Sequence, residues 1–121
     1  MLKLRLQSQL ANFHLNIDTT CEGPVTAIYG ASGAGKTTLL NLVAGLRRPD
    51  IGQLELDGNV LYSSELGIDV PPEARRLGVV FQEDLLFPHL SVDDNLRFGY
   101  ERLAAVDQRF QPEQIMELLE I

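Results

Sequence analysis

The stretch VTAIYGASGAGKTTLLNLVAGL, residues 25–46, decides the fold of this chain. An apolar run at 25–29 leads into the glycine-rich loop GASGAGKT, residues 30–37, and a helical pattern follows. Buried strand, glycine-rich loop and helix, in this order, predict a phosphate-binding P-loop of the G-x4-G-K-[ST] type. The apolar face expected for the helix consists of Leu39, Leu40, Leu42, Val43 and Leu46.

The residue types in this loop suit an anion. Gly30, Gly33 and Gly35 are all expected to adopt backbone dihedrals that are closed to residues with a Cβ. Successive N–H groups can then turn inward toward phosphate oxygens. The helix N-terminus adds unpaired amides and the positive end of its dipole. We expect Lys36 to reach the β- and γ-phosphates and the Thr37 hydroxyl to ligate the bridging Mg²⁺. The predicted phosphate-binding residues are Gly30, Ala31, Ser32, Gly33, Ala34, Gly35, Lys36, Thr37 and Thr38.

Composition excludes several classes of function. The 121 residues, 45% hydrophobic and 22% charged, suit one modest globular domain or part of a larger one. A net charge of −7 argues against a nucleic-acid partner. No stretch approaches the roughly 18–20 apolar residues of a membrane span and no signal peptide is visible, so a membrane role would need a partner. Cys21 is the single cysteine, which excludes an internal disulfide and favours a reducing cytosol.

Several strands are expected around the loop. Apolar and polar residues alternate over 2–6 and 13–18, as in half-buried strands. The runs 54–56 and 60–62 flank Asp57-Gly58, which predicts a hairpin. We expect a loop over 63–72 and a further apolar strand over 77–81, ending at Gln82.

Helix signals mark the rest of the chain. The helix after the loop is expected to end near Gly45. Ser91 with Asp94 resembles a capping box and predicts a helix over 93–106. Pro112 occupies a predicted first helical position, and this last pattern reaches Ile121 without a cap, so we expect the N-terminal portion of a longer protein. The apolar face of the last helix is expected to contain Ile115, Leu118 and Leu119.

Three motifs together resemble the ATPases of ABC transporters. Residues 30–38, GASGAGKTT, resemble the Walker A motif of that family, and 77–84, LGVVFQED, its Q-loop. Residues 86–100, LFPHLSVDDNLRFGY, are similar to the segment that follows the Q-loop in importers of oxyanions, polyamines and sugars. The resemblance implies a truncated α/β P-loop NTPase with an antiparallel β subdomain. Residues 1–82 would form that subdomain and the P-loop core, and 83–121 the start of the helical subdomain.

Within the family, the sequence is most similar to ATP-binding subunits of molybdate importers. This implies a subunit that binds and hydrolyses ATP, with Mg²⁺, to energise import of molybdate or a related oxyanion. Gln82 matches the family's glutamine that touches Mg²⁺ and the attacking water. The implied catalytic residues are therefore Lys36 and Gln82, and the implied metal ligands Thr37 and Gln82.

The resemblance also implies partners. These are a second copy in a homodimer, integral membrane permease subunits and, indirectly, a periplasmic or extracellular binding protein. The implied location is the cytoplasmic face of the membrane, through the permease. The family's signature motif, Walker B aspartate, catalytic glutamate and switch histidine are absent from these 121 residues. We therefore expect them to bind nucleotide at most and to be inactive alone.

Other functions remain open. The importer ATPases for sulfate, iron or polyamine share these motifs; a soluble ABC ATPase of translation or DNA repair is disfavoured by LFPHLSVDDN. A small-molecule kinase would need an arginine lid, and a GTPase an N-K-x-D motif that is absent.

Individual side chains have simpler interpretations. The family's adenine-stacking aromatic is unassigned, because residues 2–10 contain none and Phe13 is expected in the core. We expect His14 to face solvent, and helix-start carboxylates at 93 and 94. For His89 the resemblance implies a place near the surface that receives the membrane subunit, and a solvated or hydrogen-bonded loop histidine is the alternative. Arg75 and Arg76 could reach a phosphate, but we expect both side chains to lie in solvent at the edge of a loop.

Overall fold

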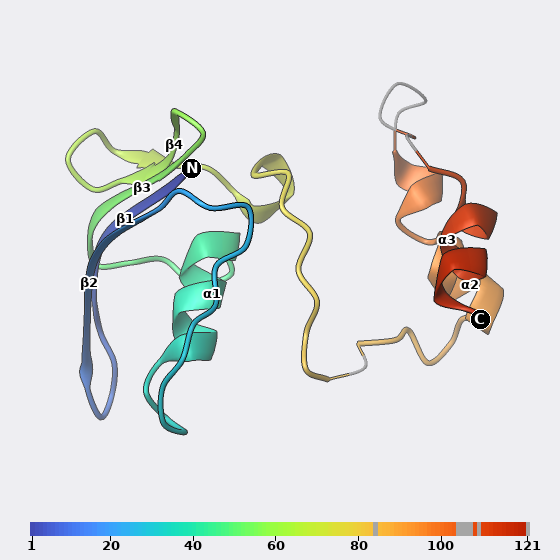
Figure 1. Ribbon diagram of the computed structural model, residues 1–121, viewed down its shortest axis with the longest axis horizontal. Coiled ribbons are helices and arrows are strands. Elements are labelled where there is room, and N and C mark those ends of the chain that lie inside the picture. Colours follow the sequence, from blue (N-terminus) through green and yellow to red (C-terminus); the bar gives the residue numbers. More distant parts are fainter. Residues whose placement is uncertain (84, 104–107, 109, 121) are drawn as a thin grey trace. The chain divides into compact units, whose positions relative to one another are not determined.

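Figure 1 shows the computed structural model, which describes residues 1–83, 85–103, 108 and 110–120. The chain divides into two compact units, Met1–Val79 and Val80–Ile121. The first unit holds a sheet and the helix α1 (Lys36–Ala44), and the second holds short helices.

An antiparallel sheet of five strands forms the first unit, in the order β2-β1-β3-β4-β5. In β1 alternate side chains are buried, as the sequence pattern predicts, and these include Leu4 and Leu6. In β2 Leu15 is buried and Ile17 is half-buried, while the residue between them is exposed. Asp57-Gly58 makes the predicted hairpin between β3 and β4. The strands are β1 Leu2–Gln9, β2 His14–Cys21, β3 Ile51–Leu56, β4 Asn59–Ser63 and β5 Ile68–Asp69.

The core lies between one face of this sheet and α1. Leu39 and Leu42 of the helix join a cluster of buried side chains from β1, β2, β3 and β4. The opposite face is polar and carries cross-strand ion pairs, Lys3 to Glu55 at 2.9 Å and Arg5 to Asp18 at 3.1 Å. The burial of one face and solvation of the other explain the period of two in the sequence.

Two predicted strands are not formed. Residues 25–29 and 77–81 have no strand structure, and they expose Val25, Tyr29 and Val80 almost fully. A strand persists only where a neighbouring strand pairs with its backbone N–H and C=O groups. Within the described part of the chain, neither run has such a neighbour, since the sheet consists of the five strands above. An apolar run without a pairing partner therefore stays irregular.

Two smaller predictions are corrected in the same unit. The region 63–72 is not entirely a loop, because Ile68–Asp69 pairs with the end of β4 as β5. The buried face of α1 consists of Leu39, Leu42 and Ala44, whereas Leu40 and Leu46 are more than half exposed. The helix does end at Gly45, as predicted.

The second unit contains α2 (Val92–Arg97), a 3-10 turn at Tyr100–Arg102 and α3 (Pro112–Leu119). The helix predicted over 93–106 therefore stops at Arg97, and residues 104–107 lie outside the described ones. The Ser91–Asp94 capping box and the position of Pro112 are confirmed. None of the described helices has the length and apolar character of a membrane span.

The apolar face of α3 is narrower than predicted. Ile115 lines a hollow with Leu96 of α2 and is 41% exposed. Leu119 also lines this hollow but is 59% exposed, and Leu118 is 76% exposed. Arg97 connects the two helices, because its guanidinium contacts Asp93 at 2.9 Å and Glu113 at 2.7 Å.

Candidate nucleotide-binding site

The glycine-rich loop takes its shape from two glycines. Gly33 and Gly35 have φ values of +79° and +91°, in the left-handed region that residues with a Cβ rarely adopt. Gly30 is different, because its φ lies outside that region; a Cβ there would meet the Cβ of Ala34 at 3.3 Å. The expectation that all three glycines need unusual dihedrals is therefore wrong for Gly30.

The sheet supports the end of this loop. A Cβ at Gly35 would lie 3.0 Å from ring atoms of Phe13 and 3.2 Å from a methyl group of Leu15. Phe13 is half-buried and packs against the main core, which confirms the prediction made for it. The start of α1 is thus held directly against the hairpin of β1 and β2.

The N-terminus of α1 has no cap from a side chain. Gly35 is the N-cap residue, it provides no side-chain hydrogen bond, and the first turn contains no acidic residue. The first amides of an α-helix have no partner within the helix, so an uncapped start presents several free donors. Residues 23–49 also contain no Asp or Glu, although the whole chain carries a net charge of −7. The local field therefore favours an anion.

Lys36 lies over the beginning of the loop. Its ammonium group donates hydrogen bonds to the carbonyl oxygens of Gly30 at 2.8 Å and Ala31 at 2.7 Å. The loop therefore closes around the lysine, and a positive charge is held at its centre. Thr37 is exposed in the first helical turn and Thr38 is half-buried beside it. These groups together can bind a polyphosphate and present a hydroxyl to a divalent cation.

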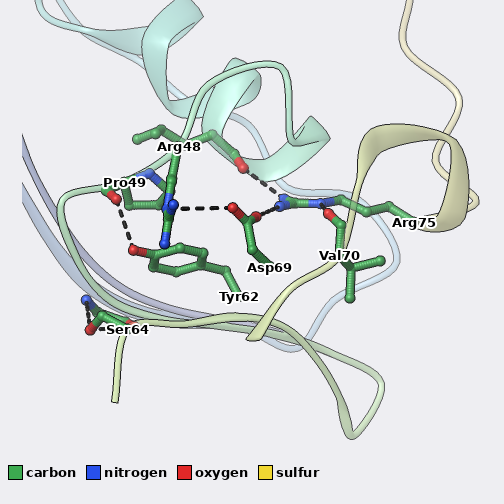
Figure 2. Close-up of polar contacts among 9 residues, drawn as sticks. Arg48, Pro49, Tyr62, Ser64, Asp69, Val70 and Arg75 are labelled. Atoms are coloured by element: carbon green, nitrogen blue, oxygen red, sulfur yellow. Dashed lines mark hydrogen bonds and ion pairs between the residues drawn. The ribbon is translucent and has the colours of Figure 1, made fainter. Parts of the chain in front are cut away.

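Arg75 stands at the opposite end of α1, and the prediction of a solvated position is wrong for it. Its side chain is 1% exposed. The guanidinium donates to the backbone carbonyls of Leu42 at 2.9 Å and Val43 at 2.8 Å. It also donates to the carbonyl of Val70 at 2.7 Å (Figure 2). Burial lowers the pKa of Arg75 from its ordinary value, and the nearby Asp69 carboxylate opposes that shift. Arg76 is exposed, as predicted.

Sequence reasoning missed the burial of Arg75 because two of its acceptors, the carbonyls of Leu42 and Val43, are distant in the chain. One signal was present: α1 has no basic residue in its last turn, a place where a cation stabilises the negative end of the helix dipole. The pattern does not say which distant segment supplies that cation.

Gln82, the other predicted catalytic residue, lies outside the compact unit that contains the glycine-rich loop. Gln82 is exposed and belongs to the second unit, whereas Lys36 and Thr37 belong to the first. His14 is exposed, as predicted. His89 is also exposed, and its ring lies edge-on to Phe87 at 5.9 Å. Among the residues that the structure describes, no group of His, Cys, Asp and Glu is arranged to hold a metal ion.

A glycine-rich loop that precedes an uncapped helix and surrounds a lysine defines a P-loop nucleotide-binding protein. The profile of the family described as "ABC transporter" matches residues 12–121. The chain therefore belongs to the ABC transporter family.

Within this family, the chain is similar to several curated proteins of one name. The chain is 50% identical over 121 residues to the "Molybdenum import ATP-binding protein ModC" of Paramagnetospirillum magneticum, covering all of this chain and 33% of that protein. It is 44% identical to the protein of that name from Rhodospirillum rubrum, over 100% of this chain and 33% of the relative. It is 45% identical to "ModC 1" of Azotobacter vinelandii, over 99% of this chain and 34% of the relative. The chain thus spans about a third of the length of these curated relatives.

Proposed function

We propose that this chain is the N-terminal part of an ATP-binding and ATP-hydrolysing subunit that energises import of molybdate or a related oxyanion. The observation that carries the proposal is the P-loop, in which Lys36 and the free amides of α1 converge in a region without carboxylates. The names of the relatives, which are molybdenum import proteins, support the choice of cargo.

ATP with Mg²⁺ is the ligand that these residues fit. The absence of a side-chain cap on α1 leaves its first amides for phosphate oxygens, and residues 30–38 surround that position. Lys36 would exchange its contacts with loop carbonyls for contacts with the β- and γ-phosphates. Thr37 would ligate Mg²⁺, which neutralises charge on the phosphates. Gln82 would be a second ligand of Mg²⁺ and would help to orient the attacking water.

The second unit supports a role in binding the permease. Leu85, Leu86 and Val92 are each more than half exposed on either side of the FPHL segment. Asn95 fixes the backbone of this segment: its amide group accepts from the Phe87 N–H at 2.8 Å and donates to the carbonyls of Leu90 at 3.3 Å and Ser91 at 2.9 Å. An ordered loop that exposes large apolar side chains is typical of a protein interface.

The remaining partners follow from the same proposal. The subunit would act as a homodimer, bound to permease subunits at the cytoplasmic face of the membrane and served indirectly by a periplasmic or extracellular binding protein. No nucleic-acid partner is proposed, since the chain carries a net charge of −7.

Calorimetry tests the nucleotide site. The complete gene product that carries this sequence should bind Mg-ATP, and Lys36→Ala should weaken binding at least about 100-fold, because a charge-assisted contact to two phosphates is removed. Lys3→Ala is the matched control, since Lys3 pairs with Glu55 on the polar face of the sheet. If the wild-type protein gives no heat of binding with Mg-ATP, the proposal is wrong.

Uptake measurements test the cargo. Membrane vesicles that contain the subunit with its permease and binding protein should accumulate molybdate when ATP is supplied inside. Sulfate at the same concentration should be taken up more slowly. Uptake of sulfate, iron or polyamine in preference to molybdate would keep the ATPase assignment and overturn the molybdate assignment.

A further inference from the structure

The helix α1 has a different environment at each end. Its N-terminal turn carries Lys36 and Thr37 of the proposed nucleotide site, and its C-terminal turn contains no basic residue. Arg75, which is 33 positions away from Leu42, provides the missing cation there. The last carbonyls of a helix lack the usual amide partner from the next turn, and those of Leu42 and Val43 accept hydrogen bonds from this guanidinium.

The C-cap of α1 and Arg75 are in direct contact. Gly45 has a φ of +81°, and a Cβ at that position would lie 2.6 Å from Nε of Arg75. The guanidinium is therefore packed against the glycine that ends the helix. The position of the helix end and the position of Arg75 depend on each other, because dense packing leaves neither free to shift alone.

Further contacts join this pair to the sheet. Asp69 in β5 lies between two arginines, 3.4 Å from Nη2 of Arg75 and 3.4 Å from Nε of Arg48 (Figure 2). The Tyr62 hydroxyl, buried in β4, donates to the carbonyl of Pro49 at 2.8 Å. The turn that follows α1 is thereby attached to two strands.

We propose that Arg75 is a positioning residue for the phosphate-binding loop. It fixes α1 on the sheet, and the helix, as a rigid element of nine residues, carries that position to Lys36 at its other end. This inference rests on the proposed function, because it concerns affinity for Mg-ATP. Lysine is not an adequate replacement: Arg75 donates in several directions at once from a planar group, and an ammonium on a flexible stem does not reproduce that arrangement.

The test compares variants of the complete gene product. Arg75→Met removes all donors, Arg75→Lys keeps the charge, and Arg76→Met is the matched control at an adjacent, exposed arginine. Calorimetry gives both the dissociation constant for Mg-ATP and the fraction of molecules able to bind, so that the affinity refers to folded protein. We expect Arg75→Met to weaken binding about tenfold and Arg75→Lys about fivefold, as for a coupling between distant sites. Arg76→Met should match the wild type.

Amide hydrogen exchange provides a readout that a purely structural role would not change. The amide of Gly45 donates to the Leu42 carbonyl and that of Arg47 to the Asn41 carbonyl, so both report on the end of α1. Since coupling is reciprocal, Mg-ATP should slow exchange at these two amides in the wild type and in Arg76→Met. The slowing should be lost in Arg75→Met.

The outcomes separate the two proposals. Wild-type affinity per folded molecule in both Arg75 variants, or no ATP-dependent protection at Gly45 and Arg47 in the wild type, overturns the positioning role alone. If Arg75→Met does not fold, Arg75→Lys and the wild-type exchange data still decide. A wild-type protein that binds no Mg-ATP overturns the proposed function and this inference with it.

Discussion

Phe13 and Gly35 are packed so closely that no side chain fits between them. A Cβ at Gly35 would lie 3.0 Å from both Cε2 and Cζ of the Phe13 ring. Gly35 also has a φ of +91° and is the residue at which α1 begins. The aromatic ring beside the first hairpin therefore bears directly on the geometry of the phosphate-binding loop.

Replacement of Gly35 should affect both stability and binding. Gly35→Ala combines a strained positive φ with a clash, so we expect the free energy of unfolding to fall by about 3 kcal/mol. Affinity for Mg-ATP should fall at least about tenfold, because the first amides of α1 move. Denaturant unfolding and calorimetry on the complete gene product measure the two effects.

Gly33→Ala is the matched control for this comparison. Gly33 has a φ of +79°, but nothing lies within 4 Å of the position its Cβ would take. In Gly33→Ala, backbone strain alone should therefore lower the free energy of unfolding by about 1 kcal/mol. If Gly35→Ala and Gly33→Ala lower the free energy of unfolding by the same amount, the contact with Phe13 has no energetic effect.

Gln82→Ala should separate hydrolysis from binding. We expect the rate of ATP hydrolysis in the complete gene product to fall roughly 10- to 100-fold, because under the proposed function Gln82 would orient the attacking water. The dissociation constant for Mg-ATP should change less than about threefold, since under the proposed function Lys36 and the loop amides would make most of the contacts with the phosphates. Glu83→Ala, at the adjacent exposed position, is the control. A large loss of ATP affinity in Gln82→Ala would mean that this residue has a structural role.

Ser91→Ala should destabilise α2 locally. The Ser91 hydroxyl accepts from the Asp94 N–H at 3.1 Å, and the Ser91 N–H donates back to the Asp94 carboxylate at 3.4 Å. Loss of such a cap costs about 1 kcal/mol. Hydrogen exchange at the amides of α2 should therefore become about fivefold faster, as that free energy implies. Ser91→Thr keeps the acceptor, so its α2 amides should exchange at the wild-type rate. If the α2 amides of Ser91→Ala also exchange at the wild-type rate, the Ser91 cap does not stabilise the helix.

The contact between α2 and α3 should weaken in acid. The pKa of the Glu113 carboxyl is held below its ordinary value, first by a backbone N–H at Glu113 itself and second by the Arg97 guanidinium. A carboxylate with a lowered pKa stabilises the folded state above its ordinary pKa of about 4.3, and that contribution is lost as the pH falls through the lowered value. The protection factors of the α3 amides, which compare the measured exchange rate with the intrinsic rate at the same pH, should therefore fall as the pH is reduced below about 4.

Glu113→Gln is the test of this pH dependence. In this variant the protection of the α3 amides should depend less on pH than in the wild type. Added salt should reduce the difference between the two proteins, because the ion pair is exposed. Glu117→Gln on the same helix serves as the control. If both variants keep the wild-type profile, Glu113 does not contribute to the acid sensitivity of α3.

Local patterns predicted much of the first unit correctly. The alternation in β1 and β2, the Asp57-Gly58 hairpin and the end of α1 at Gly45 are all as expected. Each depends on neighbouring residues: side-chain period, turn dihedrals, or the left-handed conformation of a glycine. The failures depend on distant residues instead. Apolar runs at 25–29 and 77–81 predicted strands, but a strand also needs a pairing partner elsewhere in the chain.

The sequence by itself determined the glycine-rich loop for which we propose phosphate binding, because nine consecutive residues, 30–38, contain its glycines, its lysine and its helix start. Only the tertiary structure decided that Phe13 supports Gly35 and that Arg75 is buried at the far end of α1. The physical reason is the range of the interactions. Backbone dihedrals and helix termini follow from adjacent residues, whereas a guanidinium becomes buried only where the fold brings enough acceptors around it.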